Sequence, residues 1–246
     1  MQTVCGLDRS KGLDLILHTP GGSLAATESI VYYLRKMFGN DIRVIVPQIA
    51  MSAGTMIALS AKEIIMGKES NLGPIDPQYG GLSCAGIIEE FKEAMSDVIA
   101  DPQKATIWGN IIGKYHPTFI GECRKAVDWS EKIATEWLKE NMFSTYKNKE
   151  KMAKRVVENL SSHIKTFSHS RHIHGDELRS LGLKIVDLEG LDDKRIEDCR
   201  DFQDAILTLH HAYMHTFSTS NAIKIVENQN KNAMVMIIKG MEGRKK

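Results

Sequence analysis

Two segments of the chain follow the same plan of strand, tight turn and helix. The turns are HTPGGS at residues 18–23 and AMSAG at residues 50–54, and their separation of about 30 residues is the length of a βαβ unit with parallel strands. Apolar residues at 13–17 and 42–46 predict the two strands, the first of them buried on both faces of the sheet. This repetition favours an α/β fold built around a mostly parallel sheet.

The residues at the two turns have the properties of an acyl-transfer site. Gly21 and Gly22 permit positive φ values and leave their N–H groups unobstructed, so this turn can donate to a developing negative charge. Ser52 lies at the entrance of the helix predicted over residues 53–62, between small neighbours, as in a nucleophile elbow. The positive end of that helix would favour an oxyanion bonded to the Ala53 N–H. The alternative is that Ser52 only caps the helix, and local pattern alone favours capping.

Three ordered motifs resemble the serine dehydrogenase proteinase family, which is related to signal peptide peptidase A and, more distantly, to the Clp protease proteolytic subunit. They are LILHTPGG at residues 15–22, AMSAGTM at 50–56 and LGPIDPQ at 72–78. Later segments of the chain also resemble that family, namely KYHP at 114–117, SRHI at 170–173 and HH at 210–211. The resemblance implies the Clp/crotonase fold, with repeated βα units around a mostly parallel sheet and helical additions. It also implies that Ser52 is the nucleophile and that Gly22 and Ala53 supply the backbone donors of an oxyanion hole.

The resemblance leaves the general base open. In the Clp subunit a histidine on the segment after the nucleophile is the base, but the corresponding residues 73–78 contain Asp76 and no histidine. Relatives of signal peptide peptidase use a lysine further along, and Lys92 lies 40 residues beyond Ser52. A buried lysine can act as a base because desolvation lowers its pKa, although the amphipathic pattern around Lys92 alone predicts a solvated side chain. The alternatives are Lys104, Lys114 and His172.

Domain boundaries follow the same patterns. Residues 1–190 are predicted to form the catalytic core, with a helical insertion at about 86–160, and residues 191–246 a carboxy-terminal helical extension with a helix over 201–218. Members of the resembled family have more chain before residue 13, including a strand of this sheet. We therefore expect an amino-terminally shortened form with an unpaired sheet edge.

Composition excludes several classes of protein. A net charge of +1 gives no reason to expect nucleic acid or acidic lipid as a partner. The four cysteines lie far apart without CxxC spacing, which indicates reduced thiols and a cytoplasmic location. The chain has no signal peptide pattern and no apolar stretch long enough to span a bilayer.

The leading hypothesis is a serine endopeptidase with a Ser52–Lys92 dyad that acts on peptide or protein substrates without metal or organic cofactor. Two alternatives remain: a crotonase-like enzyme that binds acyl-CoA thioesters, and an inactive assembly or scaffold protein. The resemblance implies a homo-oligomer. Membrane association is expected only through an amino-terminal segment that this sequence lacks.

Overall fold

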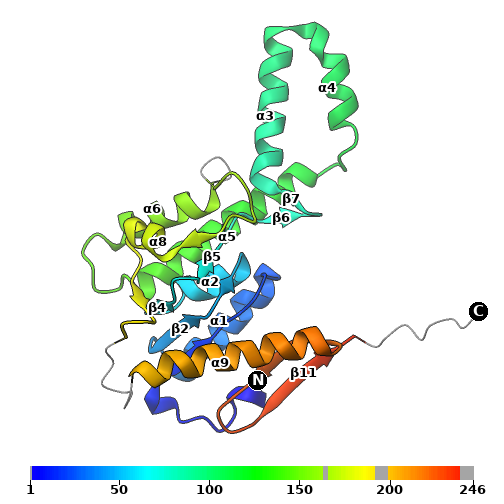
Figure 1. The fold of residues 1–246 in the computed structure, drawn as a ribbon. Helices are drawn as coiled ribbons and strands as arrows, with labels where there is room; N and C mark the ends of the chain where they lie inside the picture. The colour runs from blue at the N-terminus through cyan, green and yellow to red at the C-terminus, as the bar shows by residue number, and fades with distance from the viewer. Residues whose placement is uncertain (1, 163–165, 192–198, 239–246) are drawn as a thin grey trace, which may run out of the picture. The chain divides into compact units, whose positions relative to one another are not determined.

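The computed structural model describes residues 2–162, 166–191 and 199–238 (Figure 1). The chain forms two compact units, one of residues Leu13–Asp187 and the other of Met1–Gly12 together with Leu188–Lys246. All of the residues predicted from sequence to act in catalysis belong to the first unit.

A parallel sheet forms the centre of the first unit, as the repeated pattern predicts. Its strands pair in the order β1-β2-β4-β9, and every pair is parallel. The strands are β1 (Leu13–Ile16), β2 (Ile42–Val46), β4 (Glu63–Met66) and β9 (Ile185–Asp187). The mixed α/β architecture with a mostly parallel sheet is therefore confirmed.

Burial differs between the first two strands. Every residue of β2 is buried, but Asp14 and Ile16 of β1 are exposed, so the prediction that the first strand is buried on both faces was wrong. Within the described residues β1 pairs with β2 alone, and an edge strand has a less complete covering. Asp14 also pairs with the buried Arg43, which donates a hydrogen bond of 2.6 Å to each oxygen of the Asp14 carboxylate.

A second, smaller sheet is formed by short segments that follow β2 and β4 along the chain and by one later segment. Its strands pair in the order β3-β5-β8, with β3 (Ile49–Ala50) parallel to β5 (Asn71–Leu72) and β5 antiparallel to β8 (Ile173–His174). Beyond β5 the chain forms the hairpin β6 (Gln78–Tyr79) and β7 (Leu82–Ser83).

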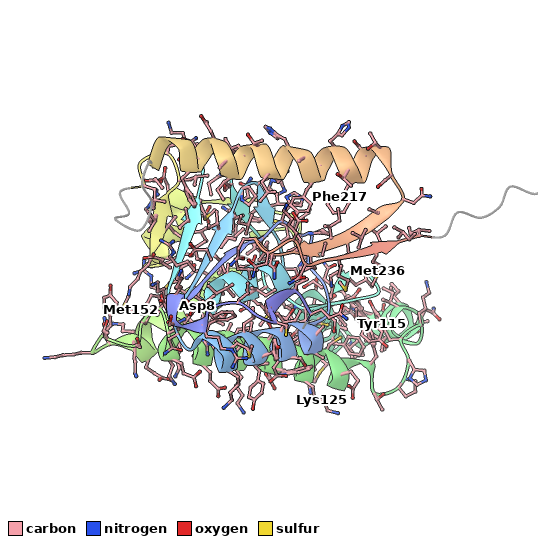
Figure 2. The ribbon with its side chains drawn as sticks, turned by 90° about the horizontal axis from the view of Figure 1, so that it is seen from below. Asp8, Tyr115, Lys125, Met152, Phe217 and Met236 are labelled. Carbon is pink, nitrogen blue, oxygen red and sulfur yellow. The ribbon has the colours of Figure 1, made fainter. Side chains whose placement is uncertain are left out.

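Helices surround both sheets and account for the predicted helical insertion. The elements before the insertion are α1 (Leu24–Phe38) and α2 (Ala53–Leu59), and those within it are α3 (Cys84–Ala100), α4 (Ala105–Ile112), α5 (Phe119–Glu140) and α6 (Lys149–Ser161). The α5 and α6 helices bury apolar residues in the same core as β2 and β4. Helices α3 and α4 lie side by side as a hairpin (Figure 1), tied by a 3.1 Å hydrogen bond from the Trp108 indole to Asp97. Tyr115, which follows α4, is labelled in Figure 2. Its ring stacks on the ring of Phe119, with the two ring centroids 5.4 Å apart.

The unit closes with a short helix and a strand. Helix α8 (Gly175–Leu181) ends at Gly182, whose φ of 103° lies in the left-handed region that favours glycine. Strand β9 follows and pairs with β4. Gly182 thus supplied a reliable signal for the end of the helix.

The other unit contains one long helix and an antiparallel strand pair. Helix α9 (Cys199–Thr219) confirms the helix predicted over 201–218. Strand β11 (Ala233–Ile237) is short and apolar. Its partner β10 (Ala222–Glu227) was not predicted. Over the described part of the chain, no helix is both long enough and apolar enough to cross a membrane.

Candidate active site

The two turns singled out in the sequence are bonded to each other. Thr19 forms an isolated parallel bridge with Ala50. Its N–H donates to the Ile49 carbonyl at 3.0 Å, and its own carbonyl accepts from the Met51 N–H at 3.0 Å. The glycine-rich turn and the Ser52 turn are therefore neighbours, as the βαβ arrangement predicts.

Ser52 has the backbone conformation of a sharp turn between strand and helix. Its φ is 51° and its ψ is −114°, immediately before α2. A residue with a Cβ rarely adopts such angles, and strain of this kind concentrates at functional sites. The Ser52 hydroxyl makes no capping hydrogen bond, so the interpretation of Ser52 as a simple helix cap fails. The side chain is partly exposed and makes no hydrogen bond to any described residue.

The strain at Ser52 can be measured by comparing two substitutions. Because glycine adopts a φ of 51° without a Cβ penalty, we expect Ser52→Gly to have a free energy of unfolding about 1 kcal/mol higher than Ser52→Ala. Urea denaturation of both variants tests this. Equal stability, or a more stable alanine variant, would show that the turn stores no strain.

Gly21 packs directly against Ser52. A Cβ placed on Gly21 would lie 3.0 Å from the Ser52 Cβ and 3.6 Å from the Ser52 Oγ. The φ of 125° at Gly21 also requires glycine. Its N–H donates to the Thr19 hydroxyl at 3.1 Å, which fixes the turn beside the serine.

The two predicted oxyanion donors are available. In the described part of the chain, neither the Gly22 N–H nor the Ala53 N–H has a backbone or side-chain acceptor. The Gly22 position is open, since an added Cβ would meet nothing within 4 Å. Ala53 is the first residue of α2, where unpaired N–H groups concentrate positive potential. Both groups can therefore donate to a bound carbonyl oxygen.

The third sequence motif also packs against the Ser52 turn. Buried Thr55 accepts a hydrogen bond from the Gly73 N–H at 2.9 Å, and its hydroxyl lies 2.7 Å from the Ala50 carbonyl and 2.9 Å from that of Gly73. A Cβ on Gly73 would lie 2.5 Å from the Met51 Cε. Gly73 thus packs against the Ser52 turn from the β5 side.

Sequence reasoning missed a hydrogen bond between a buried carboxylate and a histidine at the end of this motif. Asp76 Oδ1 lies 2.7 Å from His169 Nδ1, the Asp76 side chain has no exposed surface, and the His169 side chain is 23% exposed. The other oxygen, Oδ2, is buried without a partner in the described structure. The one available signal was a carboxylate inside the sequence Gly-Pro-Ile-Asp-Pro, because nothing in the sequence pairs it with a histidine 93 residues away.

Cys84 is a competing nucleophile that its surroundings inactivate. Burial raises the pKa of the Cys84 thiol to about 12, with further contributions from a hydrogen bond with Cys123 and from the charges of Cys123 and Asp76. Since the thiolate is the reactive form of cysteine, Cys84 stays protonated and inert. Ser52 is left as the better-placed nucleophile.

The predicted base residues lie on exposed parts of the chain. Lys92, on α3, and Lys114, beyond α4, are exposed. Lys104 is 44% exposed and forms a 3.0 Å ion pair with Asp97, and His172 is exposed just before β8. The burial on which the Lys92 hypothesis depends is therefore not observed in this chain, and its role stays a prediction.

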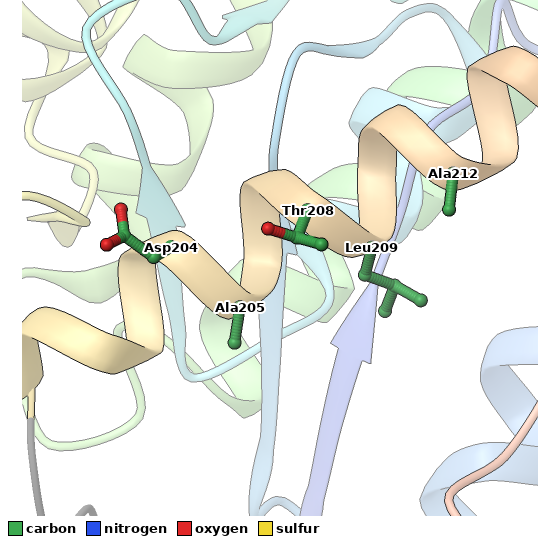
Figure 3. A pocket seen from close by; sticks show the side chains of 5 residues that line it. All are labelled: Asp204, Ala205, Thr208, Leu209 and Ala212. Carbon is green, nitrogen blue, oxygen red and sulfur yellow. The ribbon is translucent and has the colours of Figure 1, made fainter.

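A hollow of about 590 Å³ lies along α9, outside these elements (Figure 3). It is lined by one face of the helix, namely Asp204, Ala205, Thr208, Leu209 and Ala212. This face offers one carboxylate and one hydroxyl, and its whole lining comes from a single helix. The Ser52 turn is the better candidate site.

Comparison with known proteins agrees with this geometry. The family model described as ClpP-like SDH-type serine proteinase matches residues 4–190. The uncharacterized protein MJ1495 of Methanocaldococcus jannaschii is 31% identical over 173 residues, which are 70% of this chain and 51% of that protein. The uncharacterized protein MJ0137 of the same organism is 40% identical over 101 residues, or 41% of this chain and 35% of its own length. The chain thus spans about half of the first relative and about a third of the second.

Proposed function

Because the chain belongs to the family of ClpP-like SDH-type serine proteinases, we propose that it is a serine endopeptidase with Ser52 as the nucleophile. The observation that carries the proposal is the conformation of Ser52, a strained turn residue whose hydroxyl caps no helix and lies against Gly21. A serine retained for stability alone would use its hydroxyl in the fold.

The proposed reaction uses groups already described. The Ser52 Oγ attacks the peptide carbonyl, and the Gly22 and Ala53 N–H groups donate to the oxyanion that forms. Collapse of this tetrahedral intermediate releases the amine and leaves an ester on Ser52, which water then hydrolyses. Such preorganised backbone donors contribute roughly 3–4 kcal/mol each to the lowering of the activation barrier.

The role of Lys92 as the general base of a Ser52–Lys92 dyad is a separate part of the proposal and needs its own test. A lysine general base works best where burial disfavours the ammonium form, whereas the Lys92 side chain is exposed on α3. The peptidase proposal itself does not depend on Lys92. It requires only that some group accepts the Ser52 proton.

Peptides in extended form are the proposed substrates. An extended chain could run beside the residues that follow β3 and β5 and bond to them through its main chain, which would give little side-chain specificity. Self-association into a homo-oligomer, expected from the family resemblance, and a cytoplasmic location, expected from the spacing of the cysteines, accompany this proposal.

Hydrolysis of an unfolded protein such as casein, measured by release of new amino termini, tests the proposal. A peptidase should produce them without added metal or cofactor. Titration with coenzyme A in the same buffer distinguishes the crotonase-like alternative. Tight coenzyme A binding without cleavage would contradict the proposal in favour of an acyl-CoA enzyme, and neither cleavage nor binding by folded protein would favour a scaffold.

A further inference from the structure

The strand pair β10-β11 exposes apolar side chains to solvent. Every residue of β11 is exposed, including Met236, which is labelled in Figure 2. Among the described residues of 222–238, the large apolar side chains that are 36% to 61% exposed are Ile223, Val226, Met234, Val235, Met236, Ile237 and Ile238. A sheet of two strands is only marginally stable in water, and a patch of this kind indicates an interaction surface.

The main chain of β11 has a free edge. Within the described residues β11 pairs with β10 alone. The Asn232 carbonyl accepts from the Asn228 N–H at 3.1 Å, and the Ile238 N–H donates to the Asn221 carbonyl at 3.0 Å. Because neighbouring residues of an antiparallel strand direct their main-chain groups to opposite edges, the even-numbered residues of 232–238 face β10. The residues whose N–H and C=O groups point outward are therefore Ala233, Val235 and Ile237.

The two strands differ in how their outer edges are protected. On β10, Lys224 and Glu227 carry charges, and the pairing is irregular between Ala222 and Lys224. Charges and bulges are the features by which edge strands avoid pairing with other chains. Residues 232–238 contain no charged residue and no proline. Strand β11 therefore presents an unprotected edge to another extended chain.

The chemistry of this edge favours a second copy of the chain as its partner. Lipid offers no hydrogen bonds to outward N–H and C=O groups, so open sheet edges do not lie in hydrocarbon. When two β11 strands pair antiparallel around Val235, each Val235 meets its equivalent and Ala233 lies opposite Ile237. Small side chains then face large ones, and residues 232–238 bring no like charges together. Each pair can exchange two main-chain hydrogen bonds.

We propose that β11 is a dimerisation strand that pairs with the β11 of a second copy to form a sheet in the order β10-β11-β11-β10. The pairing has two-fold symmetry, so it closes at two copies. This contact lies outside the residues 4–190 that match the family model. The inference does not depend on the peptidase proposal.

Sedimentation velocity of the full chain over a range of concentrations tests the proposal. The paired strands form a small interface, so we expect reversible self-association with a dissociation constant of about 1–100 μM. Val235→Lys should raise this constant at least roughly 10-fold, because it opposes two like charges at the centre of the pairing. Ile223→Lys adds the same charge to β10 at a side chain that is likewise 52% exposed. This matched control should associate as the unaltered protein does.

A charge-pair experiment tests the antiparallel register. Val235→Lys and Val235→Glu should each be dissociated at a concentration at which the unaltered protein is paired. An equal mixture of the two variants should associate again, because lysine then lies opposite glutamate. Thermal denaturation of each variant verifies that it is folded, as expected for a change at an exposed position.

Four outcomes would overturn the inference. One is unaltered protein that does not associate at about 100 μM. Equal association of the unaltered protein and Val235→Lys would assign the contact to another surface, and a mixture of the Lys and Glu variants that stays dissociated would exclude pairing around Val235. Co-sedimentation with phosphatidylcholine vesicles that is lost in Val235→Lys would assign β11 to a lipid surface instead. None of these outcomes bears on the peptidase proposal, because Ser52 belongs to the other compact unit.

Discussion

Ser52→Ala is expected to lower the rate of peptide hydrolysis roughly 10³- to 10⁶-fold, the range seen when the nucleophile of a serine hydrolase is removed. The fold should tolerate this change, because the Ser52 hydroxyl makes no capping bond and no hydrogen bond to a described residue. We expect the free energy of unfolding to change by less than about 0.5 kcal/mol. Initial rates of casein cleavage, with urea denaturation of the same preparations, measure both quantities.

A matched control is available in Ser96→Ala, which changes an exposed serine of α3. It should hydrolyse casein at the rate of the unaltered protein. Retention of activity in Ser52→Ala would contradict the assignment of the nucleophile. A loss of activity that accompanies unfolding would mean that the hydroxyl supports the structure, against the bonding pattern described above.

Gly54→Ala is the second change for which we expect a large effect, because the added methyl group would push apart the two turns that form the site. A Cβ at Gly54 would overlap the Thr19 Cγ2. Thr19 cannot rotate freely to avoid it, because its hydroxyl accepts from the Gly21 N–H at 3.1 Å and its χ1 is restricted by β-branching. The variant should lose about 1–3 kcal/mol of stability and on the order of 10²-fold in hydrolysis rate through displacement of the Gly21 turn.

A second substitution provides a rescue that only this mechanism predicts. Thr19→Ser removes the obstructing methyl group and keeps the hydroxyl that bonds to Gly21. The double variant Gly54→Ala/Thr19→Ser should therefore regain most of the stability and rate, as measured in a double-mutant cycle. Additive losses from the two substitutions would show that the Thr19 contact does not couple Gly54 to the site.

The neighbourhood of the nucleophile could be predicted from sequence because its signals are local. The strand-turn-helix pattern, the adjacent glycines and the small residues around Ser52 all lie within two short segments. Parallel βαβ connections then bring such turns to one end of a sheet, and Thr19 and Ala50 are bridged as expected. The error in this region concerned β1, because a run of apolar residues does not reveal whether a strand is central or at the edge of its sheet.

The contact between Asp76 and His169 could not be predicted in the same way. Asp76 and His169 are separated by 93 residues that include the helical insertion, and no periodic pattern encodes a contact between them. The hypothesis for Lys92 depends on its spacing of 40 residues from Ser52, which resembles that in relatives of signal peptide peptidase. That spacing carries no information about burial, and helix α3 leaves the Lys92 side chain exposed.

The role of Ser52 as a nucleophile is tested most directly by locating the covalent adduct after fluorophosphonate treatment of the folded protein. Proteolytic digestion and tandem mass spectrometry would identify the modified residue. We expect a single adduct on Ser52, absent when the protein is first unfolded in urea. An adduct on another serine, or none on protein shown to be folded, would contradict the claim that the Ser52 turn is an active site.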